Sequence, residues 1–270
     1  MKLFILLLHD FPEFLAEYCF HLCELIPFKA VQLRNIILTA VPPNVTLLLE
    51  PLIATLKLET MNEISQPVRN LASIQLLEQI PFKKELDSYF LSRSSAIDLS
   101  GYLFNFGQDK SMVYNISMIN ALTLYIGHSA IQAIKNITIN SVSNSPFIDI
   151  FTNLLRTFDS QGKVKCTNLS NYELMRFIYF SGRHILLNSM ADHLRYPNSD
   201  TVYFICIILA IFNDTNEQIR EQIVRVLLER LIALRPHPWG IVFTVNELIR
   251  NPNYKLLDHN FIKCIPEVEK

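Results

Sequence analysis

Three side chains in the second half of the chain are of the types used in acid–base catalysis: His184, Asp192 and His193. A carboxylate that orients a histidine would make the histidine a general base for hydrolysis. The sequence contains no nucleophile elbow, no phosphate-binding glycine loop and no HExxH pair to complete such a site. We therefore predict that the protein is not an enzyme, and we keep a hydrolase that uses His184 and Asp192 as the weakest alternative.

A second group, near the start of the chain, combines Cys19, His21 and Cys23 with His9 close by. Zinc needs about four such ligands converging as a tetrahedron. Residues 19, 21 and 23 do not share one face of a helix, and no CxxC pair supplies further ligands. The sequence predicts neither a metal site nor a cofactor.

The chain contains five cysteines, an odd number and few for 270 residues, which favours a reducing compartment over secretion.

Two groups of basic residues suggest a second alternative function, an RNA-contacting helical module. Such a surface would use Lys83, Lys84 and the arginines at 220, 225 and 230. Glutamates neighbour both groups, at positions 85, 221 and 229. Because 24 basic residues are balanced by 25 acidic ones, the formal net charge is −1 and no overall field attracts nucleic acid. We expect a solvated stripe of ion pairs and no direct nucleic-acid binding.

The elements that carry these residues are predicted to be helices. Residues 217–234 form the clearest one, with apolar side chains at 219, 223, 224, 227, 228, 231 and 232 on one face and the charged residues on the other. Similar segments span 10–26, 29–40, 60–64, 68–80, 82–91, 111–135, 147–158, 183–194, 201–212 and 240–250. The chain contains only six glycines, and its prolines lie mostly between these segments. We therefore predict an all-α fold, a stack of antiparallel helical hairpins without a fixed repeat period.

Four local expectations follow from the same patterns. Residues 1–8 are a core helix and not a secretion leader, and Asp10 caps the helix after it. Residues 201–212 cross the core as a helix, although their β-branched content would also suit a buried strand. No segment reaches the length of a membrane span. The polar stretch 136–146 is a linker or exposed loop and the weakest point of a single domain over residues 1–270.

The most unusual hexapeptide is residues 235–240, RPHPWG, which places the only tryptophan between two prolines and a glycine. Trp239 is expected to plug the corner between two helices. The functional alternative is a rigid edge that presents aromatic surface to a partner. On that alternative the partner-binding residues would be Tyr196, Pro197, Arg235, His237 and Trp239.

Several runs resemble the carboxy-terminal homology domain of Not-one, the scaffold subunit of the eukaryotic CCR-NOT deadenylase complex. The most specific are residues 194–199 (LRYPNS) and residues 225–240, which contain RVLLERLI and RPHPWG. Shorter runs precede them, at 7–15 (LLHDFPEFL), 26–27, 32–35, 82–89 (FKKELDSY) and 119–122, and others follow at 247–252 and 266–270. The resemblance covers nearly the whole chain, in one order.

The resemblance implies a HEAT-like helical domain without catalytic activity. It also implies docking of the Not-two and Not-three/five subunits, and of short linear motifs from RNA-binding regulators, in support of mRNA deadenylation, mRNA decay and translational repression. The location it implies is the cytoplasm, and the nucleus as well.

The chain departs from the family pattern in two places. Residues 163–181 read as an insertion of about one helix and its turn, and residues 47–53 are more apolar than the turn expected there. Because the chain starts at a point internal to the usual scaffold, it reads as an excised domain or a short homologue.

Overall fold

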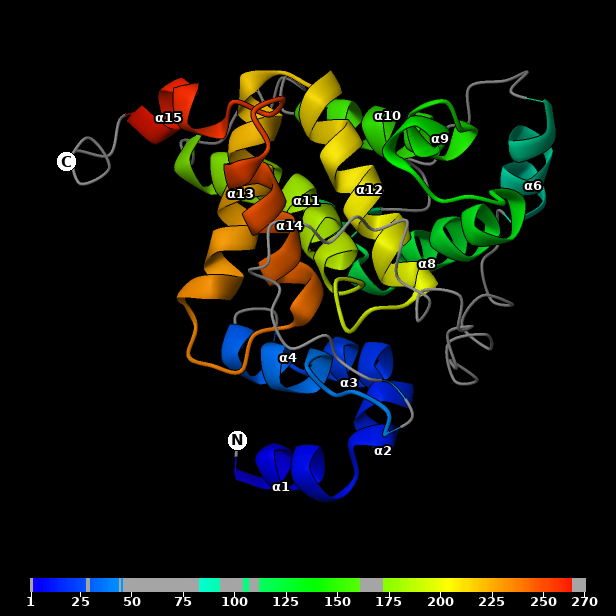
Figure 1. Ribbon diagram of the computed structural model, residues 1–270. Helices are drawn as coiled ribbons and strands as arrows, with labels where there is room; N and C mark the ends of the chain where they lie inside the picture. Colours follow the sequence, from blue (N-terminus) through cyan, green and yellow to red (C-terminus); the bar gives the residue numbers. More distant parts are fainter. Residues whose placement is uncertain are drawn as a thin grey trace.

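Helices dominate the computed structural model, which describes residues 2–27, 30–43, 45, 83–92, 104–106, 112–160 and 172–263 (Figure 1). Within these ranges the α-helices are α1 Lys2–Asp10, α2 Pro12–Glu17, α3 Cys19–Leu25, α4 Val31–Leu38, α6 Lys83–Ser92, α8 Ile116–Ala133, α9 Ile139–Ser143, α10 Pro146–Ser160, α11 Tyr172–Ala191, α12 Ser199–Asp214, α13 Glu217–Ile232, α14 Trp239–Arg250 and α15 Asn260–Lys263. A 3₁₀ turn, η4, covers Leu256–Asp258. The all-α prediction is confirmed.

Helix α12 forms the centre of the fold and is buried on every side from Asp200 to Phe212. A segment that is apolar all round is stable only when other elements enclose it. Helices α8, α9 and α10 pack on one flank of α12, whereas α13 and α14 pack on the other (Figure 1). Its residues are therefore helical, as predicted, and the alternative of a buried strand is wrong.

The stretch predicted as an exposed loop, 136–146, contains helix α9 instead. Thr138 and Ser141 form a reciprocal capping box that starts this helix. Its Val142 is fully buried in the main core, and α9 packs directly against α12. The polar composition hid the helix because serine, threonine and asparagine were used as caps.

Helix α13 matches the predicted segment but distributes its side chains differently. Ile219, Ile223 and Leu227 are buried, as expected, and so is Arg230, which was predicted to face solvent. Ile232, predicted to be in the core, is 82% exposed. The apolar stripe thus continues past the point where the core ends.

The four N-terminal helices form a separate group below the main stack (Figure 1, blue). Helix α1 is present, but none of its residues is buried, so the prediction of a core helix is wrong. Asp10 does not cap α2: the N-cap position is Phe11, and the Asp10 carboxylate accepts from His9 Nδ1 at 2.8 Å. The predicted helix 10–26 is divided at Tyr18 into α2 and α3.

Two short strands, β1 Phe104–Phe106 and β2 Met112–Tyr114, pair antiparallel, with Phe104 opposite Tyr114. The helix predicted from residue 111 therefore begins only at Ile116, after the Asn115 cap. Helix α11 begins at residue 172, eleven residues before the predicted start at 183. The helices predicted at 60–64 and 68–80, the departure at 47–53 and residues 163–171 lie outside the described residues. Among the helices that are described, none is both long and apolar enough to cross a membrane.

Candidate docking site at the junction of two turns

The two runs singled out in the sequence, 194–199 and 235–240, lie against each other. The backbone N–H of Gly240 donates to the carbonyl of Arg195 at 2.8 Å. A Cβ atom on Gly240 would lie 2.7 Å from the carbonyl carbon of Leu194. Only glycine therefore allows the first turn of α14 to approach the turn before α12 this closely.

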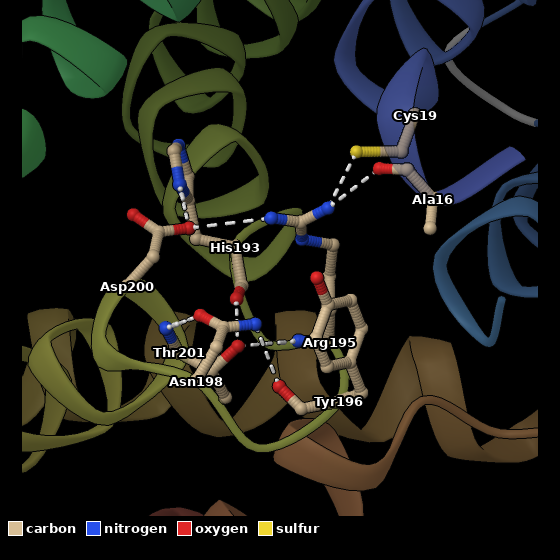
Figure 2. A network of polar contacts seen from close by, with 8 residues as sticks. All are labelled: Ala16, Cys19, His193, Arg195, Tyr196, Asn198, Asp200 and Thr201. Atoms are coloured by element: carbon tan, nitrogen blue, oxygen red, sulfur yellow. Dashed lines mark hydrogen bonds and ion pairs between the residues drawn. The ribbon is translucent and has the colours of Figure 1, made fainter. Parts of the chain in front are cut away.

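The turn between α11 and α12 is held by its own polar side chains (Figure 2). Asn198 Oδ1 accepts from the Thr201 N–H at 2.9 Å, which caps α12, and Asn198 Nδ2 donates to the Tyr196 carbonyl at 2.8 Å. Thr201 Oγ1 donates to the His193 carbonyl at 2.9 Å and accepts from the Arg195 N–H at 3.2 Å. Residues 196–199 (YPNS) thus belong to a turn whose backbone groups are hydrogen-bonded by its own side chains.

Arg195 joins this corner to the N-terminal helices. Its guanidinium is buried, and Nη1 donates to the Ala16 carbonyl at 3.1 Å and to Cys19 Sγ at 2.8 Å (Figure 2). Nη2 lies 3.8 Å from Asp200 Oδ2, and the guanidinium lies 4.8 Å from the ring centre of Phe20. Burial raises the pKa of the Cys19 thiol, so the thiol stays neutral and accepts through sulfur.

A second buried cluster joins helix α4 to α11 and α13. Asp192 accepts from Arg34 Nη1 and from Arg230 Nη2, both at 2.6 Å. Arg230 also donates to Asn188, and Asn35 Nδ2 donates to the Arg230 carbonyl at 2.7 Å. Burial lowers the pKa of Arg34, but Asp192 and Cys23 together outweigh it, so the pKa lies above its ordinary value and the arginine stays charged.

These contacts argue against a hydrolase that uses His184 and Asp192. Both Asp192 oxygens are engaged by arginines, and His193 Nδ1 lies 2.9 Å from Asp200, with its ring stacked on Phe204. His184 lies 3.4 Å from Glu229, and burial lowers its pKa. His184 and Asp192 thus serve separate structural contacts, and the proposed pair is wrong.

The arginines invoked for RNA contact are also engaged. Arg220 donates to the carbonyls of Phe212 and Asn213, each at 2.7 Å, and so closes the end of α12. Arg225 pairs with Glu229 at 3.2 Å, as the predicted ion-pair stripe requires, but Arg230 is buried on Asp192. Lys83 and Lys84 remain exposed on α6.

One small cavity lies among the described residues. Its volume is about 20 Å³, and it is lined from α3, α8 and the end of α11, by Phe20, Glu24, Asn120 and His193 among others. That volume holds one or two water molecules. No group of three or more metal-ligating side chains is found within the described ranges.

The five residues predicted to bind partners divide into two sets. Tyr196 and Trp239 are each 8% exposed and Pro197 is buried, and Trp239 stacks on Phe243 with ring centres 5.1 Å apart. Trp239 therefore plugs the corner, as expected. Arg235 is exposed and His237 is half-buried, so only these two can be reached from outside. The peptide bond between Arg235 and Pro236 is cis.

Sequence reasoning missed the buried arginines and the exposed end of α13. Arg230 follows Ile219, Ile223 and Val226 at spacings of four, three and four residues, which places it on their buried face. That spacing was a usable signal, but a charged residue was assumed to face solvent. Arg34 and Arg195 carry no comparable local signal, because the groups that they contact lie far away in the sequence.

Comparison with known proteins assigns the chain to a family. The family described as "CCR4-Not complex component, Not1" matches residues 1–270. The CCR4-NOT transcription complex subunit let-711 of Caenorhabditis elegans is 36% identical over 280 residues, covering 100% of this chain and 10% of that protein. General negative regulator of transcription subunit 1 of Schizosaccharomyces pombe is 31% identical over 276 residues, covering 99% of the chain and 12% of the relative. The chain thus spans about a tenth of the length of these relatives.

Solved structures agree in fold. The NOT1 superfamily homology domain from Chaetomium thermophilum superposes with a TM-score of 0.79 at 29% identity, over 99% of this chain and 51% of that one. The Not1 C-terminal domain in complex with Not4 superposes with a TM-score of 0.71 at 24% identity, over 98% of this chain and 52% of that one. With the family match over its whole length, the chain belongs to the Not1 family of CCR4-Not complex components.

Proposed function

We propose that this domain docks the Not-two and Not-three/five subunits and short motifs of RNA-binding regulators, in support of mRNA deadenylation, mRNA decay and translational repression. The observation that carries the proposal is the membership of the whole chain in the Not1 family. The Not1 domain is a non-catalytic structural module of the complex. We place its site of action in the cytoplasm and the nucleus.

The geometry fits a docking platform. Arg34, Arg195 and Arg230 fix the N-terminal helices against the main stack through buried ion pairs and hydrogen bonds. A surface that keeps its shape loses little conformational freedom when a partner binds, which favours affinity. A neighbour of the same fold was solved in complex with Not4, so a protein partner is compatible with this architecture.

The physical mechanism is tethering. A scaffold that binds a nuclease and a regulator at once raises the effective concentration of the nuclease near the RNA that the regulator holds. No group on the scaffold needs to touch the reacting phosphate. Loss of the docking surface therefore removes recruitment while the nuclease keeps its own activity.

A pull-down tests this function directly. The immobilised domain is mixed with a purified heterodimer of Not-two-type and Not-three/five-type subunits, and the bound fraction is measured from low to moderate salt. We expect retention that changes little with salt. Retention of RNA in place of protein, falling steeply with added salt, would favour the RNA-contacting alternative. Failure to retain the heterodimer at any salt concentration would refute the proposal.

A further inference from the structure

The end of α13 and the two residues after Ala233 form an exposed edge that is mainly apolar. We call it the α13 edge and define it by Leu228, Ile232, Leu234 and Arg235. Ile232 is 82% exposed and Leu234 is 73% exposed. On the same helix Ile223 and Leu227 are each 2% exposed. The apolar stripe therefore serves the core at its start and faces solvent at its end.

This edge is held rigidly from behind. Asn35 of α4 donates to the Arg230 carbonyl at 2.7 Å, and Gln32 of α4 donates to the Arg235 carbonyl at 3.5 Å. The Arg230 side chain is anchored to Asp192 in the core. Figure 1 shows α4 beside the turn that follows α13. A helix end with these restraints presents its apolar side chains in a defined arrangement, so less conformational freedom is lost when a segment binds.

The charges around the edge favour an acidic partner. Arg235 is exposed, and no carboxylate among the described residues pairs with it. Burial, and to a smaller extent the Arg235 charge, lowers the pKa of His237, which favours the neutral ring. Glu229, on the same helix, is paired with Arg225 at 3.2 Å. Among the described residues, the charge of the α13 edge that lacks an ion-pair partner is therefore positive, that of Arg235.

The size of the edge favours a short segment over a second copy of the chain. Three apolar side chains supply far less than the ~800 Å² that each partner buries in a stable interface. A twofold contact centred here would also bring the two copies of Arg235 together without compensating carboxylates. A short amphipathic segment needs only two or three apolar anchors and a complementary charge.

We propose that the α13 edge binds a short segment of a partner subunit that carries two apolar anchors next to Asp or Glu residues. This inference rests on the proposed docking function and names the surface and the partner chemistry for it. Ile232 and Leu234 receive the anchors, while Arg235 pairs with the carboxylates. Trp239 and Tyr196 are each only 8% exposed and are not assigned to the contact.

The test measures binding of the same purified heterodimer by calorimetry to wild-type domain and to two variants. Ile232→Glu should weaken binding at least about tenfold, because it places a carboxylate where an apolar anchor and an acidic segment are bound. Its matched control is Ile249→Glu, which alters another exposed isoleucine in the last turn of a helix, 51% exposed, and should bind as wild type. Thermal unfolding confirms that both variants fold.

The sign of the partner charge is tested separately. Arg235→Glu should weaken binding by about the same factor, whereas Arg235→Lys should retain most of it. Lys263→Glu, a charge reversal at an exposed position on α15, is the control and should have no effect. Stronger binding by Arg235→Glu would show that the segment is basic and would overturn the assignment.

The outcomes separate this inference from the proposed function. If wild type and Ile232→Glu bind the heterodimer equally, the edge is not the site while docking itself stands. If wild-type domain binds no subunit, the docking function fails and the edge assignment fails with it. Concentration-dependent dimerisation of wild type that Ile232→Glu abolishes would identify a second copy as the occupant and would also overturn the proposal.

Discussion

The backbone N–H of Gly240 donates to the backbone carbonyl of Arg195 at 2.8 Å, which joins the start of α14 to the turn before α12. The two residues are far apart in the sequence, yet each lies in one of the most distinctive short runs of the chain. The arginine side chain extends from the same residue to Ala16 and Cys19. One residue thus connects the C-terminal, central and N-terminal helices.

Replacing Gly240 with alanine should destabilise the fold without changing its helical content. The added Cβ would lie 2.7 Å from a backbone carbon of Leu194, and backbone can move less than a side chain. Overpacking of this kind costs about 1–3 kcal/mol. Thermal unfolding should show a melting temperature lower by roughly 2–4 °C for each kcal/mol lost.

Gly127→Ala is the comparison, because there the added Cβ would meet the ring of Phe204 and not a backbone atom. It should cost less than Gly240→Ala. The close approach at Gly240 would be unimportant for stability if the two variants ranked in the opposite order.

Asn198→Ala should destabilise α12 more than an ordinary cap deletion does. The side chain caps the helix at Thr201 and also donates to the Tyr196 carbonyl, and it is only 1% exposed. Loss of an N-cap costs about 1 kcal/mol, and the buried carbonyl left without its donor adds about 1–3 kcal/mol. Urea unfolding monitored by circular dichroism measures the sum.

The matched control is Asn216→Ala at the start of α13. That side chain caps the Ile219 N–H at 3.1 Å and makes no second hydrogen bond within the described residues. Its cost should stay near that of a simple cap. Equal costs for the two variants would show that the Tyr196 contact contributes nothing.

Much of the fold follows from the sequence because apolar spacing reports burial directly. The helices at 201–212, 217–234 and 240–250 were predicted nearly to their ends, since prolines and asparagines mark those ends. Helix α9 was missed because its capping residues look like a polar loop. The prediction for α1 was wrong because hydrophobicity alone does not say which neighbour covers a helix.

The candidate site was predictable only in part. The unusual composition of residues 235–240 indicated a rigid corner, and Trp239 does plug it. The arginine contacts were beyond prediction, because Arg34 and Asp192 are paired across more than half the chain. A single sequence gives no local sign of such a pair, so Asp192 was considered as a catalytic group and not as the partner of two arginines.

Raising the pH above 9 should weaken the fold through buried thiols and phenols, among them Cys206 and Tyr254. Burial raises the pKa of Cys206 from 9.0 to about 12, and burial with a smaller effect of Glu247 raises that of Tyr254 from 10.0 to about 12. The unfolded chain therefore loses these protons first, and the folded state holds more protons between about pH 9 and 12. The free energy of unfolding falls as the pH rises through this window, and below pH 9 these groups add no pH dependence.

Cys206→Ala isolates the thiol contribution. Urea unfolding of wild type and variant at several values between pH 8 and 11 should give a shallower decline for the variant, by at most about 1.4 kcal/mol per pH unit. The cavity left by the substitution lowers stability at every pH alike and leaves the slope unaffected. Parallel declines for the two proteins would contradict burial of a neutral thiol at this position.

The buried pair of arginines on Asp192 leads to the sharpest prediction. In the wild type each carboxylate oxygen of Asp192 contacts one arginine at 2.6 Å. Asp192→Asn would leave Arg34 and Arg230 buried without their common counter-charge. Removing one partner of a buried ion pair costs about 3–5 kcal/mol, so the variant should unfold at much lower urea concentration or fail to fold. The triple variant Arg34→Met, Asp192→Leu, Arg230→Met removes all three charges and should recover most of that stability. If the triple variant is as unstable as Asp192→Asn, the stability of this cluster comes from the hydrogen bonds of Arg34 to Cys23 and of Arg230 to Asn188, which the triple variant also removes, and not from charge balance.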